Sequence, residues 1–276
     1  MTKTPRLKAP PGACDTHMHI YEDRFALTPN ATFKPPHSPV EAYIEMRRRI
    51  GVERTVVVQP AGYGFDNTCT LEAMAAMGPS ARGIAVVSPD VTDVELERLT
   101  EAGMRGIRYF MLAGGALPWE SLETMAARVA GFGWHVQLQL DGRLLPEREA
   151  LLKRLTGTLV IDHNGKFLEP VPPDHPSFKC LLRLLENGPT WVKLSAPYET
   201  SKLGPPLYAD VGALAKALAR AAPERMVWAS NWPHPSVPRD KVPDDADLLD
   251  LLLEWAPDER ARRKILVDNP ASLYGF

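Results

Sequence analysis

The sequence lacks the features that mark several large classes of protein. It has three cysteines in 276 residues, Cys14, Cys69 and Cys180, and no CxxC pair. This odd, widely spaced set predicts free thiols in a reducing compartment rather than a disulfide framework. No apolar run approaches the roughly 20 residues that a membrane-spanning helix needs. The formal net charge is only −2, so we expect no basic surface for nucleic acid or an anionic membrane.

Two further absences bear on the domain layout, the location and the fold class. The basic N-terminal segment lacks the apolar stretch of a secretory signal, which predicts a short extended arm at 1–12, a single domain at 13–276 and a cytoplasmic location. A doubly wound open sheet is the competing architecture, and it needs a glycine-rich GxGxxG turn after an early strand. The glycines at 114–115 lack that spacing, so the open sheet is disfavoured.

The chain does contain a regular succession of short apolar runs. Eight are rich in β-favouring residues, and helical patterns lie between most of them. The runs are 13–20, 54–60, 82–89, 105–112, 135–142, 159–165, 191–198 and 226–233. The clearest helical patterns are 94–102, 121–130, 213–221, 247–255 and 260–267. Eight strand–helix units in about 250 residues predict an α/β fold, a (β/α)8 TIM-like barrel.

In such a barrel, functional side chains lie at the carboxyl ends of the strands. The first run ends in an HxH pattern, and because side chains alternate along a strand, His17 and His19 should share one cavity. The sixth run brings His163 to the same end, if Leu159, Ile161 and His163 share the inward face. The alternative is that these histidines only pack against neighbouring residues in the fold.

Asn231 lies near the end of the eighth run, with the same parity as Val227 and Ala229, so it should face the same cavity as the histidines. A carboxamide ligates a cation poorly and cannot take a proton from water. A lone asparagine after a strand is usually a turn residue, so its candidacy depends on the three histidines.

Arg108 lies inside the fourth run, and a buried arginine requires an anion. A substrate carboxylate, gripped by both arms of the guanidinium, is one choice, and a structural ion pair is the other. Lys193 also lies in a predicted strand, and the same two partners are open for it: a substrate carboxylate or a structural ion pair. Four more polar residues fall at strand ends and would suit a substrate rich in hydroxyl and carboxylate groups: Gln59, Gln139, Lys166 and Ser195.

Together these motifs resemble the amidohydrolase superfamily, in the branch that contains the 2-pyrone-4,6-dicarboxylate lactonases and the galactarolactone isomerases. The likeness runs from about residue 11 to residue 276. Its carriers are DTHMH at 15–19, RGIR at 105–108, VIDHNGK at 160–166, WASNWPHP at 228–235 and NPASLY at 269–274. The resemblance implies an amidohydrolase-type barrel with its site at the carboxyl ends of the strands.

The resemblance also implies which positions could bind a metal ion. Metal-dependent relatives use the HxH pair, a lysine or glutamate on strand four, histidines on strands five and six, and an aspartate on strand eight. Here strand four offers Arg108, strand eight offers Asn231, and strand five offers Gln137, Gln139 and Asp141. The lactonase branch is metal-independent, so the resemblance implies an enzyme without metal or other cofactor.

Asn231 departs from the lactonases, whose strand-eight aspartate activates water, and resembles the galactarolactone isomerases. The expected reaction is an intramolecular transesterification of a sugar-diacid lactone, D-galactaro-1,5-lactone to the 1,4-lactone. His163 would shuttle the proton, and His17 and His19 would donate to the oxyanion. Asn231 would orient the attacking hydroxyl. Arg108 and Lys166 would hold the carboxylate. The hydroxyl groups of the substrate would form hydrogen bonds with Gln59, Gln139 and Ser195.

Other functions remain open at this stage. One is a lactonase acting on a 2-pyrone-4,6-dicarboxylate-like substrate. Another is a zinc-dependent hydrolase or decarboxylase that uses His17, His19 and His163. A third is a barrel that binds a sugar acid without catalysis. In every case the expected partner is a small molecule, and no pattern sets an oligomeric state.

Overall fold

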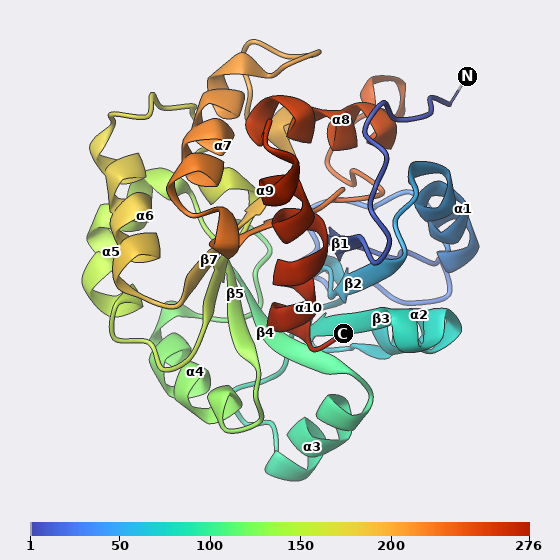
Figure 1. The fold of residues 1–276 in the computed structure, drawn as a ribbon. Coiled ribbons are helices and arrows are strands. Elements are labelled where there is room, and N and C mark those ends of the chain that lie inside the picture. The colour runs from blue at the N-terminus through green and yellow to red at the C-terminus, as the bar shows by residue number, and fades with distance from the viewer. Residues whose placement is uncertain (1) are drawn as a thin grey trace.

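The computed structural model describes residues 2–276, and in this range eight parallel strands pair in chain order. They are β1 (Cys14–Met18), β2 (Arg54–Val58), β3 (Ala81–Ala85), β4 (Met104–Phe110), β5 (His135–Gln139), β6 (Leu159–Ile161), β7 (Thr190–Leu194) and β8 (Met226–Trp228). Figure 1 shows the strands at the centre with helices around them. The predicted (β/α)8 barrel is confirmed.

The barrel is nearly closed by hydrogen bonds between β1 and the end of β8. The hydroxyl of Thr16 donates to the Trp228 carbonyl at 2.9 Å, and the Asn231 amide donates to the His17 carbonyl at 2.9 Å. The His19 amide donates to the Trp232 carbonyl at 2.8 Å. The closing seam therefore runs directly beside the predicted site residues of both strands.

Helices cover the outside of the barrel (Figure 1). They are α1 (Val40–Ile50), α2 (Thr68–Met77), α3 (Asp93–Glu101), α4 (Leu122–Ala130), α5 (Leu145–Leu152), α6 (Pro176–Asn187), α7 (Ala209–Ala221), α8 (Asp245–Trp255), α9 (Glu259–Arg263) and α10 (Asn269–Tyr274). The predicted helix at 260–267 ends early, because a π-helical turn, Lys264–Asp268, separates α9 from α10. None of the helices within residues 2–276 is both long and apolar enough to cross a membrane.

The apolar core has two parts. The larger lies between strands and helices, where side chains such as Ile107 and Leu138 pack. The smaller lies inside one end of the barrel, where Tyr274 of α10 packs against Cys14 and Val56. Tyr274 also meets the ring of His135, the first residue of β5, so α10 covers the amino-terminal end. The opposite end of the barrel, formed by the carboxyl ends of the strands, holds a cavity.

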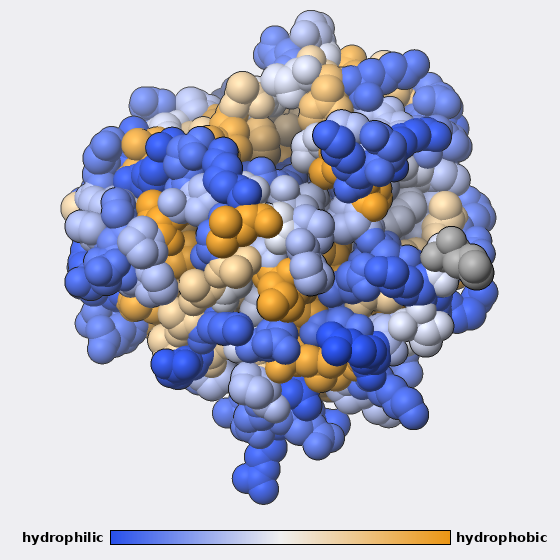
Figure 2. Space-filling model, turned by 90° about the horizontal axis from the view of Figure 1, so that it is seen from above, coloured by the Kyte–Doolittle hydropathy of each residue, from blue (hydrophilic) through white to orange (hydrophobic). Residues whose placement is uncertain are grey.

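The N-terminal residues 2–12 contain no helix or strand. They are held against α8 and the residue before it: the backbone amide of Lys3 donates to Asp244, which precedes α8, and the backbone amide of Leu7 donates to Asp250 of α8 at 2.8 Å. On this side of the molecule, Leu203 and Leu207 in the loop before α7 are exposed. Figure 2 shows the surface here as small apolar groups separated by hydrophilic side chains.

Candidate active site

A cavity of about 290 Å³ opens at the carboxyl ends of the strands. Six of the predicted site residues line it: His19, Arg108, Gln139, His163, Lys166 and Asn231. Much of the remaining lining is apolar, including Phe33, Phe110, Leu112 and Leu168. Charged groups facing a partly apolar cavity interact more strongly than they would in open water.

A β-bulge in β1 aims the HxH pair. Asp15 pairs with Thr55 and Met18 pairs with Val57, so Thr16 and His17 together oppose one residue of β2. A bulge of this kind re-aims side chains. Asp15 is directed away from the histidines, and it accepts hydrogen bonds from Tyr43 of α1 and from Ser230. His17 and His19 share the barrel interior, with their Nε2 atoms 3.1 Å apart.

Hydrogen-bond partners fix the proton positions on this pair. The Val58 carbonyl can only accept, so His19 donates to it from Nδ1 at 2.7 Å. Nε2 of His19 then accepts from Nε2 of His17, whose Nδ1 accepts from the Gln137 amide at 3.3 Å. Burial, with the charge of Arg108, lowers the pKa of His19 to about 3. Both N–H groups are therefore engaged, which does not support the expectation that this pair donates to an oxyanion.

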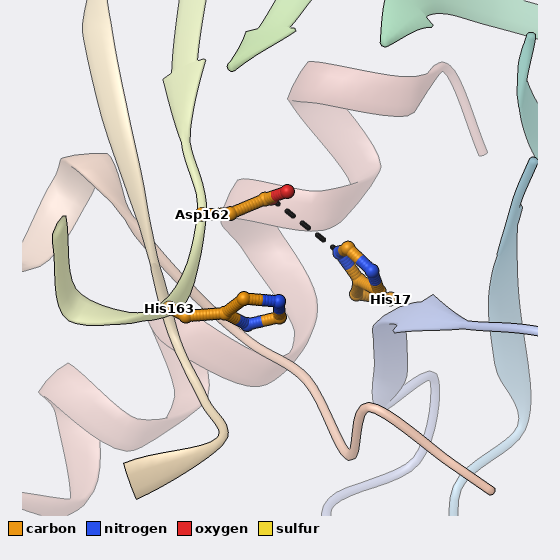
Figure 3. Close-up of side chains that lie close together, drawn as sticks. All are labelled: His17, Asp162 and His163. Carbon is orange, nitrogen blue, oxygen red and sulfur yellow. Dashed lines mark ion pairs between the residues drawn. The ribbon is translucent and has the colours of Figure 1, made fainter. Parts of the chain in front are cut away.

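His163 reaches the cavity for a different reason from the one predicted. Ile161 belongs to the apolar layer against the helices, and Asp162 is the residue that follows strand alternation into the barrel. The predicted parity of Leu159, Ile161 and His163 is therefore wrong. A left-handed backbone at His163, φ 51°, turns its ring inward, 4.8 Å from the His17 ring between centroids (Figure 3).

His163 is placed to exchange a proton. Its Nδ1 is 2.7 Å from the hydroxyl of Ser195, which can accept from it and so leave Nε2 available. Burial lowers the pKa of His163 to about 4, while Asp162 and Glu199 act to raise it. The ring is neutral near pH 7, and two nearby carboxylates stabilise the imidazolium that forms on protonation. Ser195 thus contacts His163 and does not line the cavity, contrary to its expected role with substrate.

Beneath the cavity lies a buried charged cluster. The Lys193 ammonium donates to the Thr16 carbonyl at 2.8 Å and to Gln137 at 2.6 Å, and lies 3.7 Å from Asp162. Burial lowers the pKa of Lys193 to about 8, which still leaves it charged at neutral pH. Although burial opposes ionisation of Asp162, the positive charge beside it, that of Lys193 included, holds its pKa well below the usual range. Lys193 is therefore an internal counter-ion.

This cluster bears on the zinc that the resemblance raises. His17, Asp162 and His163 bring potential ligand atoms within 4.8 Å of one another (Figure 3). The Lys193 ammonium, however, lies 3.4 Å from Nδ1 of His17 as well as 3.7 Å from Asp162. It already supplies positive charge to these two groups and would repel a dication there. The donor set therefore does not fit a divalent metal ion.

Replacing Lys193 tests whether its ammonium stabilises the buried Asp162 carboxylate. Lys193→Met leaves Asp162 as a buried charge without its ammonium, and we expect a loss of about 3–5 kcal/mol in the free energy of unfolding. Urea denaturation measures it. The matched control is Lys202→Met, whose ion pair with Glu169 is about 60% exposed on both sides and should contribute less than about 1 kcal/mol. Equal losses in the two variants would contradict the account.

Arg108 and Gln139 form one unit in the cavity. Arg108 is buried, and it donates to the Gln59 carbonyl at 3.0 Å and to the Gln139 side chain at 3.1 Å. Its Nε is buried with no hydrogen-bond partner among residues 2–276. An unsatisfied buried donor is costly, and a charged one more so, so this group favours an anionic ligand. The alternative of a close structural ion pair for Arg108 is not found within these residues.

Gln59 does not line the cavity, so its predicted contact with substrate is corrected. Its side-chain amide donates to the carbonyls of Gly64 and Asp66, and its side-chain oxygen accepts from Thr70 at 2.6 Å. These bonds hold the loop between β2 and α2. Gln59 is linked to the site by its backbone carbonyl, which accepts from Arg108.

Glu199 is a cavity residue that the sequence analysis missed. It lines the cavity from the turn after β7 and forms a buried ion pair with Lys166. Burial opposes its ionisation, yet the charges of Lys166 and His163 lower the pKa of Glu199 to about 2. Lys166 is therefore not a free cation, although an ammonium keeps two further N–H donors. No motif marks Glu199, because it meets Lys166 only in the folded chain.

Asn231 lies in the cavity with a left-handed backbone, φ 60°. Its Nδ2 donates to the Tyr198 hydroxyl at 2.9 Å and is 3.4 Å from Oε1 of Glu199. Both acceptors therefore lie on the amide-nitrogen side of the carboxamide. Asn231 also begins a turn, because its backbone carbonyl accepts from the His234 amide at 2.9 Å, while its side chain is held in the site.

Comparisons with known proteins place the chain among relatives of this kind. Residues 14–276 match the model of the family described as Amidohydrolase. The chain is 37% identical to the D-galactarolactone isomerase of Agrobacterium fabrum, over 96% of this chain and 91% of that protein. It is 33% identical to the 2-pyrone-4,6-dicarboxylate hydrolase of Comamonas testosteroni, over 98% and 92%. A ligand-free structure from Agrobacterium tumefaciens superposes with a TM-score of 0.93 at 36% identity, covering 99% of both chains.

Proposed function

The chain belongs to the amidohydrolase family, and from this we propose that it is an enzyme that acts on a carboxylated lactone by isomerising it. The proposed reaction is the metal-independent conversion of D-galactaro-1,5-lactone to the 1,4-lactone. The observation that carries this choice is Asn231 beside His163 in the cavity. A carboxamide can hold a hydroxyl but cannot deprotonate water, which favours a nucleophile supplied by the substrate itself.

Binding comes first in the proposed mechanism. Arg108 takes the free carboxylate of the substrate, because its guanidinium offers charged, directional donors and its Nε lacks a partner among residues 2–276. Lys166 retains donors beyond its ion pair and faces the same cavity, so it can bind the lactone carbonyl as negative charge develops. Gln139 fixes the guanidinium from the side.

Proton transfer follows. A hydroxyl of the bound lactone attacks the ring carbonyl carbon, and Nε2 of His163 takes its proton. When the tetrahedral intermediate collapses, the bond to the former ring oxygen breaks and His163 returns the proton to that oxygen. Atoms balance, and no water is consumed. Asn231 holds the attacking hydroxyl, and the Asp162 and Glu199 carboxylates stabilise the transient imidazolium.

Hydrolysis is the alternative that the named relatives keep open, since one of the two is called a hydrolase. A lactonase needs a general base in the cavity that takes a proton from the attacking water. Glu199 is the ionised carboxylate nearest Asn231, but its pKa of about 2 makes it a weak base, and its two oxygens are bound to Lys166 and Ser236. The geometry therefore favours isomerisation.

Proton NMR of the chelator-treated protein with freshly prepared galactaro-1,5-lactone tests the proposal. We expect the 1,4-lactone to appear ahead of any open-chain diacid, at a rate that chelation leaves unchanged. Direct formation of the diacid would establish water as the nucleophile and replace the proposal with a lactonase. Loss of activity on chelation, restored by zinc, would overturn its metal-independent part.

A further inference from the structure

A partly buried series of hydrogen bonds leads away from Asn231. Asp245, at the start of α8, accepts from Nε2 of His234 at 3.1 Å. Nδ1 of His234 is 2.8 Å from the hydroxyl of Tyr198, which in turn accepts from Nδ2 of Asn231 at 2.9 Å. His234 and Asp245 do not line the cavity. The mechanism above uses none of these three residues.

The donors and acceptors in this series of hydrogen bonds have a definite direction. A carboxylate can only accept, so Asp245 places the hydrogen of His234 on Nε2 and leaves Nδ1 to accept. The Tyr198 hydroxyl then gives its only hydrogen to His234, and its free lone pair can accept from Asn231. Every donor in this chain meets an acceptor.

Glu199 independently gives the same orientation of Asn231. Its Oε1 lies 3.4 Å from Nδ2 of Asn231 and accepts from Ser236 at 2.9 Å. If the carboxamide were flipped, its oxygen would face this ionised carboxylate and be repelled. Both hydrogens of the amide are thus directed to Tyr198 and Glu199, which leaves the side-chain oxygen for the cavity.

We propose that Tyr198, His234 and Asp245 are positioning residues that hold the Asn231 carboxamide with its oxygen toward the substrate. The inference rests on the proposed isomerisation. The site thereby presents a neutral acceptor, which grips the attacking hydroxyl and leaves its proton for His163. An aspartate at 231 would not fit, because its second oxygen would face Glu199 and a lone pair of Tyr198.

A double-mutant cycle tests the proposal. Tyr198→Phe keeps the ring and removes the hydroxyl, and we expect kcat for isomerisation to fall about tenfold with KM changed less than about twofold. In an Asn231→Ala background, the same change should leave kcat unaltered, since nothing remains to be positioned. Equal losses in both backgrounds would show a merely structural role and overturn the proposal. Tyr109→Phe is the control, because Tyr109 bonds to Ser121 outside the cavity and should leave kcat unchanged.

A measurement without substrate separates this proposal from the proposed function. In protein carrying ¹⁵N-labelled histidine, long-range ¹H–¹⁵N spectra report which ring nitrogen of His234 bears hydrogen; His234→Asn assigns the signal. We expect the Nε2–H tautomer in the wild type and a shift of the Nδ1 resonance in Tyr198→Phe. An Nδ1–H tautomer would overturn the positioning chain, whatever the activity. The predicted tautomer in a protein that does not isomerise the lactone would refute the function alone.

Discussion

Replacing His163 by asparagine is expected to lower kcat for isomerisation by about 10²- to 10⁴-fold, the usual contribution of a positioned acid–base group. Asparagine is polar and of comparable length, but it cannot take up and return a proton. Because His163 does not hold the substrate carboxylate, KM should change little. Initial rates of 1,4-lactone formation by proton NMR, over a range of substrate concentrations, separate the two constants.

The control for this variant is His37→Asn. His37 is a surface histidine whose side chain is 49% exposed and lies beside Asp23, so it should leave kcat and KM unchanged. Thermal unfolding of both variants establishes that the fold is retained. An unaltered kcat in His163→Asn would remove His163 from proton transfer and direct attention to Glu199, whose Oε1 lies 3.4 Å from Nδ2 of Asn231.

Replacing Arg108 by methionine is expected to raise KM about 100-fold. Charged hydrogen bonds contribute roughly 1.5–3 kcal/mol each, and about 2.8 kcal/mol corresponds to a factor of 100. Methionine keeps much of the apolar length of the side chain but loses the guanidinium, whose Cζ lies 5.1 Å from the centre of the Phe110 ring. The effect should fall mainly on KM, because the carboxylate contact is made both in the bound substrate and in the transition state.

Two further variants make this prediction specific. Arg108→Lys keeps the charge but loses the planar fork, so its KM should lie between those of the wild type and Arg108→Met. Arg128→Met removes an arginine that pairs with Asp93 on the helical surface, and should not change KM. A KM for Arg108→Met equal to that of the wild type would mean that another group binds the carboxylate. Lys166 would then be the candidate, since it is the other cation in the cavity.

Much of the fold and part of the site could be predicted from the sequence by itself. The eight apolar runs predicted eight strands because a parallel strand buried on both faces is apolar along its length. Each run extended beyond its strand at the carboxyl end, and there lie Asn231 and His163. Local alternation, which a sequence displays directly, predicted that His17 and His19 share one cavity. Both rings lie in the barrel interior, and of the two His19 lines the cavity.

The tertiary structure decided what each of these side chains can do. A bulge separates Asp15 from the histidines, and a left-handed backbone rather than strand parity turns His163 inward. Glu199 meets Lys166 across 33 residues of chain, and Asp245 reaches Asn231 only through Tyr198 and His234. Residue types and local periodicity set which groups arrive at the mouth. Hydrogen-bond direction and charge depend on neighbours distant in sequence, so only the folded chain determines which donors and acceptors remain for a substrate.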